Sequence, residues 1–155
     1  MGIAHNKGIL YFCAYGRGVL KVKLLDFTVS DFYCPRYYVN FGCGVTLSKS
    51  NLCVCDQETD EILLFDLSAN ILWKFVDKNL LLTPGNVTSD ANGNIYVLGL
   101  ASYNVVFISA DGKHSRQLLC REDGIENVVG THYGKDRKVL KVVNIFGNVI
   151  IYNCP

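Results

Sequence analysis

The stretch GNIYVLGLASYNVVFISADGK, residues 93–113, contains two apolar runs separated by a short polar bend, and it ends on an Asp-Gly step. Apolar runs of this length predict β-strands, and the polar bends predict turns, so we expect strand, turn, strand, turn. If the phrase recurs at a constant spacing, the chain is an array of small sheets. The function of such an array is expected in its loops.

The phrase recurs throughout the chain. With Ile95 as reference, matching apolar alternation occurs at Leu10, Leu52 and Leu140, so the spacings are 42, 43 and 45 residues. A second series of apolar runs follows after a polar bend, at 18–22, 62–65, 105–108 and 148–152. A third series precedes the reference strands and begins at Gly2, Gly44, Asn86 and Gly130. Three series with one period indicate a repeated structural unit.

The unit has four expected strands, because an outer strand follows the other three in most units. These outer strands are expected at 27–32, 70–75 and 114–119, whereas the last unit ends at Pro155 without one. Four antiparallel strands every 42 to 45 residues is the period of a β-propeller blade. We therefore predict an all-β fold, a β-propeller of four-stranded antiparallel blades, present as an open arc or partial propeller. Its units are 1–40, 41–82, 83–124 and 125–155.

Two local features support blades that pack face to face. Both faces of the second strand of each unit are largely apolar, with Lys141 as the exception. Glycines open the first strand in three units, which suits the crowded inner edge of a blade. Asn92-Gly93 and Asp111-Gly112 predict hairpin turns whose central residues both tolerate positive φ.

The phrases TPGNVTSDANGNIYVLG, YNVVFISADGKHSRQLL and GIAHNKGILYFCAYGRGVLKV resemble NHL repeats. They are most similar to the divergent NHL-type propellers at the C-terminus of tripartite-motif (TRIM) proteins. Two features depart from the family pattern: the proline before the first strand occurs only as Pro84, and the aspartate after the second strand only as Asp56. The resemblance implies a six-blade parent, of which this chain is a four-blade fragment. It also implies the substrate-binding part of a TRIM-like ubiquitin ligase, whose RING, B-box and coiled-coil domains would precede Met1.

Composition excludes several classes. Of the 155 residues 50% are hydrophobic, and the formal net charge is +1, so nothing attracts DNA or an acidic membrane surface in general. Apolar runs of about six residues are far too short for a helical membrane span. Seven cysteines without any CxxC spacing indicate reduced thiols and a cytoplasmic protein.

The residues give little sign of catalysis. His5 and His132 lie on first strands at unmatched repeat positions, and His114 follows a turn, so we expect no convergent metal site. The acidic bend at 56–61 could bind calcium, but a solvated turn is the simpler interpretation. We predict no catalytic residues and no cofactor. The alternative is a metal-dependent propeller hydrolase or lyase.

The remaining candidates are surface loops. In a propeller, the loops from second to third strand and from fourth to next first strand gather on one face. Tyrosine and arginine dominate interface energetics, so a protein partner is expected there. RNA is a weaker candidate that would need a cluster such as Arg17, Arg36 and Arg116. The predicted binding residues are Tyr15, Arg17, Arg36, Tyr37, Tyr38, Asp60, Tyr103 and Asn104. Alternatively, Tyr37 and Tyr38 anchor their loop in the core.

An open arc of four blades also predicts self-association or an unstable truncation. The arc would expose an apolar face around Tyr11 and Cys13, or around Leu140 and Val142, larger than soluble monomers tolerate.

Overall fold

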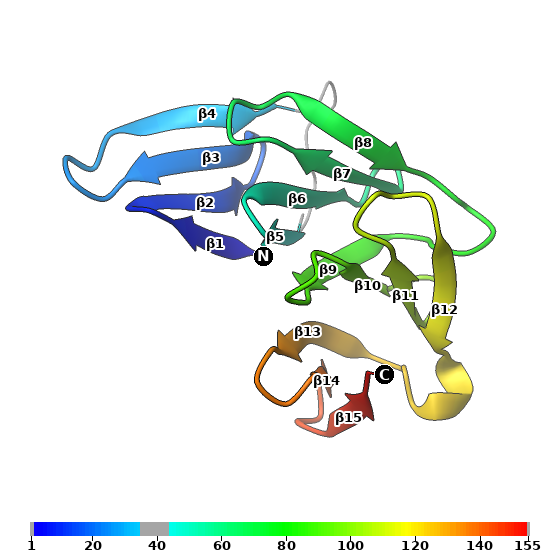
Figure 1. Ribbon diagram of the computed structural model, residues 1–155. Coiled ribbons are helices and arrows are strands. Elements are labelled where there is room, and N and C mark those ends of the chain that lie inside the picture. The colour runs from blue at the N-terminus through cyan, green and yellow to red at the C-terminus, as the bar shows by residue number, and fades with distance from the viewer. Residues whose placement is uncertain (1, 35–43, 155) are drawn as a thin grey trace.

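The computed structural model describes residues 2–34 and 44–154, and in these residues the only helix is a short 3-10 turn, η1 (Arg121–Asp123). The strands form four small antiparallel sheets, which confirms the predicted all-β propeller class (Figure 1). The first blade contains β1 (Ile3–Asn6), β2 (Ile9–Ala14), β3 (Gly18–Lys23) and β4 (Val29–Tyr33). The second contains β5 (Gly44–Ser48), β6 (Asn51–Asp56), β7 (Glu61–Phe65) and β8 (Ile71–Phe75). The third contains β9 (Pro84–Ser89), β10 (Ile95–Gly99), β11 (Asn104–Ile108) and β12 (Ser115–Leu119). The fourth contains β13 (Val128–Gly134), β14 (Val139–Asn144) and β15 (Val149–Asn153).

Within every blade the strands pair in chain order, because short turns connect antiparallel neighbours. The first strands of successive blades pack side by side at the inner edge, β1 on β5, β5 on β9 and β9 on β13. No comparable contact joins β13 to β1 in the described residues. The four blades therefore form an open arc, with the first and last blades at its two ends (Figure 1).

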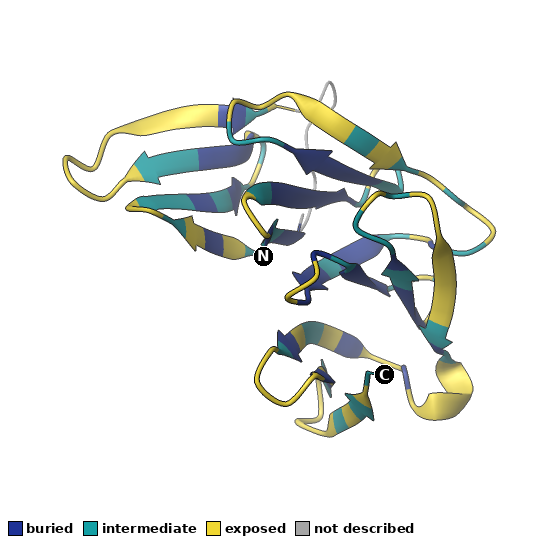
Figure 2. Ribbon diagram, in the orientation of Figure 1, coloured by how far each residue is buried: buried dark blue, intermediate teal, exposed yellow. Residues whose placement is uncertain are grey.

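The core consists of three layers, one at each boundary between blades. Side chains alternate along a strand, so each second strand contributes one face to the preceding layer and the other face to the next. At the first boundary, Tyr11 and Cys13 of β2 pack against Leu52 and Val54 of β6. Cys53 and Cys55 meet Ile95 and Val97 at the second boundary, and Tyr96 and Leu98 meet Leu140 and Val142 at the third. Figure 2 shows the result, buried middle strands and exposed outer strands β4, β8 and β12.

The prediction that an open arc exposes the faces around Tyr11 and Cys13, or around Leu140 and Val142, was wrong. Tyr11, Cys13, Leu140 and Val142 are all buried, because their side of each end blade points toward the interior of the arc. The exposed faces are the opposite ones. The large hydrophobic residues within the strands of the two end blades that are more than half exposed are Ile3, Val29, Val129, Val149 and Ile151.

Two of the three inner-edge glycines are needed for close packing. A Cβ on Gly2 would collide with the backbone nitrogen of Val45, and one on Gly44 would lie 2.8 Å from Cys55 Sγ and 3.0 Å from Asn86 Cα. A Cβ on Gly130 would meet nothing within 4 Å. The close approach of first strands therefore explains Gly2 and Gly44 but not Gly130, whose side faces no further blade in the described residues.

The hairpin turns differ in detail from the prediction. Gly93 and Gly112 adopt positive φ angles of 87° and 73°, whereas Asn92 and Asp111 do not. Each glycine instead closes a turn, since Gly93 N donates to Asp90 O at 3.3 Å and Gly112 N to Ser109 O at 2.8 Å. Only one residue of each Asx-Gly pair therefore needs the left-handed region.

Candidate functional site

Loops of two kinds gather on one side of the arc, which we call the connector face. It comprises the second-to-third strand loops at 15–17, 57–60, 100–103 and 145–148, and the described links between blades at 76–83 and 120–127. The short first-to-second and third-to-fourth turns lie on the opposite side, the hairpin face. Three of the predicted residues, Arg36, Tyr37 and Tyr38, lie outside the described residues.

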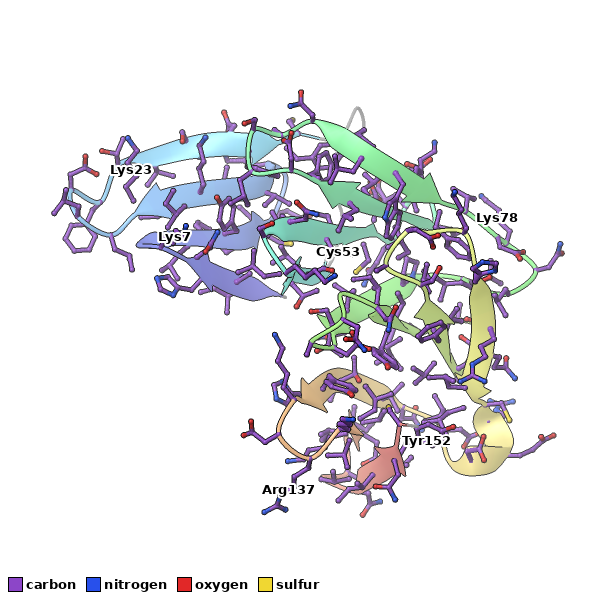
Figure 3. The ribbon with its side chains drawn as sticks, viewed as in Figure 1. Lys7, Lys23, Cys53, Lys78, Arg137 and Tyr152 are labelled. Atoms are coloured by element: carbon purple, nitrogen blue, oxygen red, sulfur yellow. The ribbon has the colours of Figure 1, made fainter. Side chains whose placement is uncertain are left out.

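The link 76–83 is fixed from both neighbouring blades. Asp60 of the second blade accepts a hydrogen bond from Thr83 N at 2.7 Å, and its other oxygen pairs with Lys78 Nζ at 3.4 Å. From the third blade, Asn104 Nδ2 donates to Leu80 O at 2.7 Å. Lys78 projects from this link at the edge of the molecule (Figure 3). Asp60 and Asn104, both predicted binding residues, thus hold the link 76–83 in place.

Asn104 is 2% exposed, so it cannot offer its side chain to a partner. Its Nδ2 also donates to Gln117 Oε1 at 3.1 Å, and its Oδ1 accepts from Ser102 Oγ at 2.7 Å. Sequence reasoning placed Asn104 on the surface because it adjoins Tyr103 in a polar bend. It begins β11 instead, and burial of its amide is tolerated because both ends of the amide are hydrogen-bonded.

Tyr103 forms a cation–π contact on the connector face. Its backbone has a φ of 50°, its side chain is 37% exposed, and the guanidinium carbon of Arg121 lies 4.3 Å from the ring centroid. Arg121 also forms a salt bridge with Glu126. This cation–π pair joins the second-to-third loop of the third blade to the link into the fourth.

Tyr15 and Arg17 lie at the far end of the face, in the first blade. Tyr15 is 69% exposed, and Arg17 forms a 2.9 Å salt bridge with Asp31. Arg116, in contrast, lies on β12 with its guanidinium 5.6 Å from the centroid of Phe107, near the hairpin face. The structure therefore separates Arg17 from Arg116.

Sequence reasoning did not select Arg121, Ile145 or Phe146. Ile145 and Phe146 are 60% and 71% exposed and occupy the same loop of the fourth blade that holds Tyr15 in the first. The repeat period could have found them, since they follow β14 as Tyr15 follows β2. Arg121 could have been found only as part of a link between blades.

The histidines lie on different blades. His5 is exposed on β1, where its Nε2 accepts a hydrogen bond from Gly8 N at 3.2 Å. His132 is exposed on β13, in the fourth blade, and His114 in the turn before β12. No group of three potential metal ligands occurs in the described part of the chain. No helix there is long and apolar enough to cross a membrane.

No protein-family model matches the chain, and no curated protein matches its sequence. Solved structures share its fold. A chain of a nidogen/laminin complex aligns with a TM-score of 0.75 and 15% identity, over 98% of this chain and 58% of that one. Virginiamycin B lyase from Staphylococcus aureus, in a catalytically inactive variant with quinupristin, aligns with a TM-score of 0.72 and 16% identity, over 99% of this chain and 55% of that one. A chain of the mitotic checkpoint complex aligns with a TM-score of 0.74 and 13% identity, over 98% of this chain and 45% of that one.

Identities this low show a common fold and no more. The chain spans about half the length of these structures. The β-propeller class is thereby supported, while the NHL and TRIM resemblance is neither supported nor contradicted.

Proposed function

We propose that the chain is a non-catalytic recognition module that binds a protein partner through its connector face. The observation that carries the proposal is the Tyr103–Arg121 pair, an exposed aromatic ring next to an arginine. Both loops are held by hydrogen bonds, the loop of Tyr103 through Ser102 Oγ and the turn of Arg121 through Cys120 N and Asp123. Residues fixed before binding lose little conformational entropy when a partner docks. Tyrosine and arginine are also the types most often found at binding hot spots.

The exposed residues Tyr15, Ile145 and Phe146 extend this surface to the other blades. Asp60 and Asn104 act as its supports, and Arg17 contributes at its edge. Arg36, Tyr37 and Tyr38 remain proposed contributors from the link between the first two blades. The propellers in the nidogen/laminin and mitotic checkpoint structures belong to protein complexes, which is consistent with this use of the fold.

The finer proposal follows the sequence resemblance. As an NHL-like propeller, the chain would select substrates for a TRIM-like ubiquitin ligase in the cytoplasm, with the ligase activity in other domains. RNA is a weaker candidate partner, because Arg17 and Arg116 do not share a face. Tight RNA binding with a steep salt dependence in a filter-binding series would favour RNA instead.

A selection experiment tests the binding face. Peptides selected from a display library on the purified chain are expected to lose affinity about thirtyfold or more with Tyr103→Ala or Arg121→Ala, the loss typical of a hot-spot residue. Phe27→Ala is the matched control, since Phe27 is an exposed aromatic residue on the hairpin face. Peptides that tolerate both connector-face changes but not Phe27→Ala would contradict the proposal.

The second candidate is a metal-dependent hydrolase or lyase, favoured by the similarity to virginiamycin B lyase. Metal analysis of the purified chain separates the two functions. Stoichiometric zinc or calcium would favour the enzyme, because a recognition module of this kind needs neither ion.

A further inference from the structure

A pocket opens between the third and fourth blades on the hairpin face, away from the proposed binding loops. Its volume is about 310 Å³, at the lower end of the range of small-molecule sites. The turn 90–94 and the turn 135–138 form its rim, and β12 and the end of β15 complete the wall. Tyr152, labelled in Figure 3, contributes from β15. The pocket thus has walls from two separate blades.

Three cations surround this pocket. Arg116 comes from the third blade and Lys135 and Lys138 from the fourth, and none of the three forms a salt bridge with a carboxylate of the described residues. The contact with Phe107 keeps the Arg116 guanidinium against the wall. Asp136 lies in the same turn as the two lysines but does not line the pocket. The rim therefore carries positive charge that no other part of the described chain neutralises directly.

The single carboxylate among the described lining residues is already engaged. Asp90 is 6% exposed, and its oxygens accept hydrogen bonds from Asn94 N at 2.9 Å, Asn94 Nδ2 at 2.8 Å and the Tyr96 hydroxyl at 3.3 Å. These neutral donors satisfy its hydrogen-bonding capacity but leave its charge. Three cations and one carboxylate give the lining a net formal charge of +2, which favours an anion.

Aromatic rings form the apolar part of the lining. Tyr96 and Tyr133 stack across the blade boundary with centroids 5.1 Å apart and an interplanar angle of 19°. Burial raises the pKa of both hydroxyls and of the neighbouring Cys154 thiol. All three groups are therefore neutral at pH 7 and add no negative charge.

We propose that this pocket binds a small organic anion, specifically a phosphate monoester of a ring compound. The phosphate would lie among Arg116, Lys135 and Lys138, and the ring against Phe107 and Tyr152. Charge-assisted hydrogen bonds to phosphate supply the affinity, and the aromatic wall supplies selectivity for a ring. The proposal is independent of the function proposed for the connector face.

Calorimetric titration of the purified chain with four probes tests the chemistry: phenyl phosphate, benzoate, inorganic phosphate and phenol. Phenyl phosphate is expected to bind most tightly, at least about tenfold tighter than phenol, and to weaken as salt is raised. If benzoate binds more tightly than phenyl phosphate, the ligand is a carboxylate and the phosphate assignment is wrong. Phenol or inorganic phosphate binding as tightly as phenyl phosphate would overturn the proposal, as would no binding of phenyl phosphate.

Variants locate the binding. Arg116→Gln and Lys138→Gln are each expected to raise the phenyl phosphate dissociation constant about tenfold, equivalent to loss of one charge-assisted contact. Lys113→Gln is the control, because Lys113 is an exposed cation in the nearby turn 109–114 that does not line the pocket. In the amide spectrum, phenyl phosphate should shift Asn92, Asn94 and Lys135. Equal losses in all three variants, or shifts confined to another surface, would overturn the proposal.

Discussion

Gly44 opens β5 and Gly130 is the third residue of β13, yet only Gly44 is crowded. Gly44→Ala is expected to cost about 1–3 kcal/mol of unfolding free energy, because the new Cβ would press on Cys55 and on the backbone of β9. Gly130→Ala should be nearly neutral, since open space surrounds its Cβ position. Urea denaturation of both variants measures the difference. Equal destabilisation would mean that β13 is as closely packed as β5.

Asn104 was expected to contact a partner, but its buried side chain instead supports the link 76–83 of the connector face. Asn104→Ala should lower the unfolding free energy by about 2 kcal/mol or more, because Leu80 O and Ser102 Oγ would lose a buried hydrogen-bond partner. Asn153→Ala is the control, since Asn153 is exposed at the end of β15. Denaturant melts of the two variants give the comparison. A neutral Asn104→Ala would show that water replaces the amide without cost.

In several turns between strands, the side chain of the Asp or Asn that opens the turn accepts hydrogen bonds from backbone N–H groups of the same turn. Asp66 accepts from Ser68 N and Asn70 N, each at 2.9 Å. Asn144 does the same with Phe146 N and Asn148 N, at 3.1 and 2.9 Å. The Asp-x-x-x-Asn and Asn-x-x-x-Asn spacings are visible in the sequence and predict these turns better than the Asx-Gly pairs did.

Where the side chain is an Asp, these hydrogen bonds make the free energy of unfolding depend on pH in the acid range. Hydrogen bonds from Asn70 lower the pKa of Asp66 from its ordinary 3.8, so its stabilising effect is complete above that value and disappears as pH falls through the lower folded pKa. Asp66→Asn should keep the turn, as Asn144 does in its own, and flatten the loss of stability as pH falls below about 4. Urea midpoints measured across that range test it. An unchanged acid slope would exclude Asp66 as a contributor.

The open arc leaves an exposed apolar face at each end. On the last blade, Val149 and Ile151 are 52% and 61% exposed and line a shallow hollow with Val143. We expect the isolated chain to self-associate through such faces, and Ile151→Lys to shift it toward monomer in sedimentation velocity at equal concentration. Leu25→Lys, at an exposed turn residue away from the sheet faces, should not. A wild-type monomer with a cooperative thermal transition would contradict this expectation.

The repeat period, the strand positions and the blade class follow from the sequence because each blade is assembled from neighbouring segments. Paired strands are adjacent in the chain, so alternation around Leu10, Leu52, Ile95 and Leu140 predicts both the strands and their two apolar faces. The crowding at Gly2 and Gly44 could be inferred in the same way, from the rule that first strands approach closely.

Contacts between blades and between loops could not be inferred so directly. Because each end blade has a neighbour on one side only, Tyr11 and Leu140 are buried between blades. Val149 and Ile151 lie on the opposite side of the last blade and are exposed. Likewise, Tyr103 meets Arg121 only because a link between blades folds back over the third blade. Such contacts depend on how separate hairpins are oriented in space, and the local alternation of side chains carries no information about that orientation.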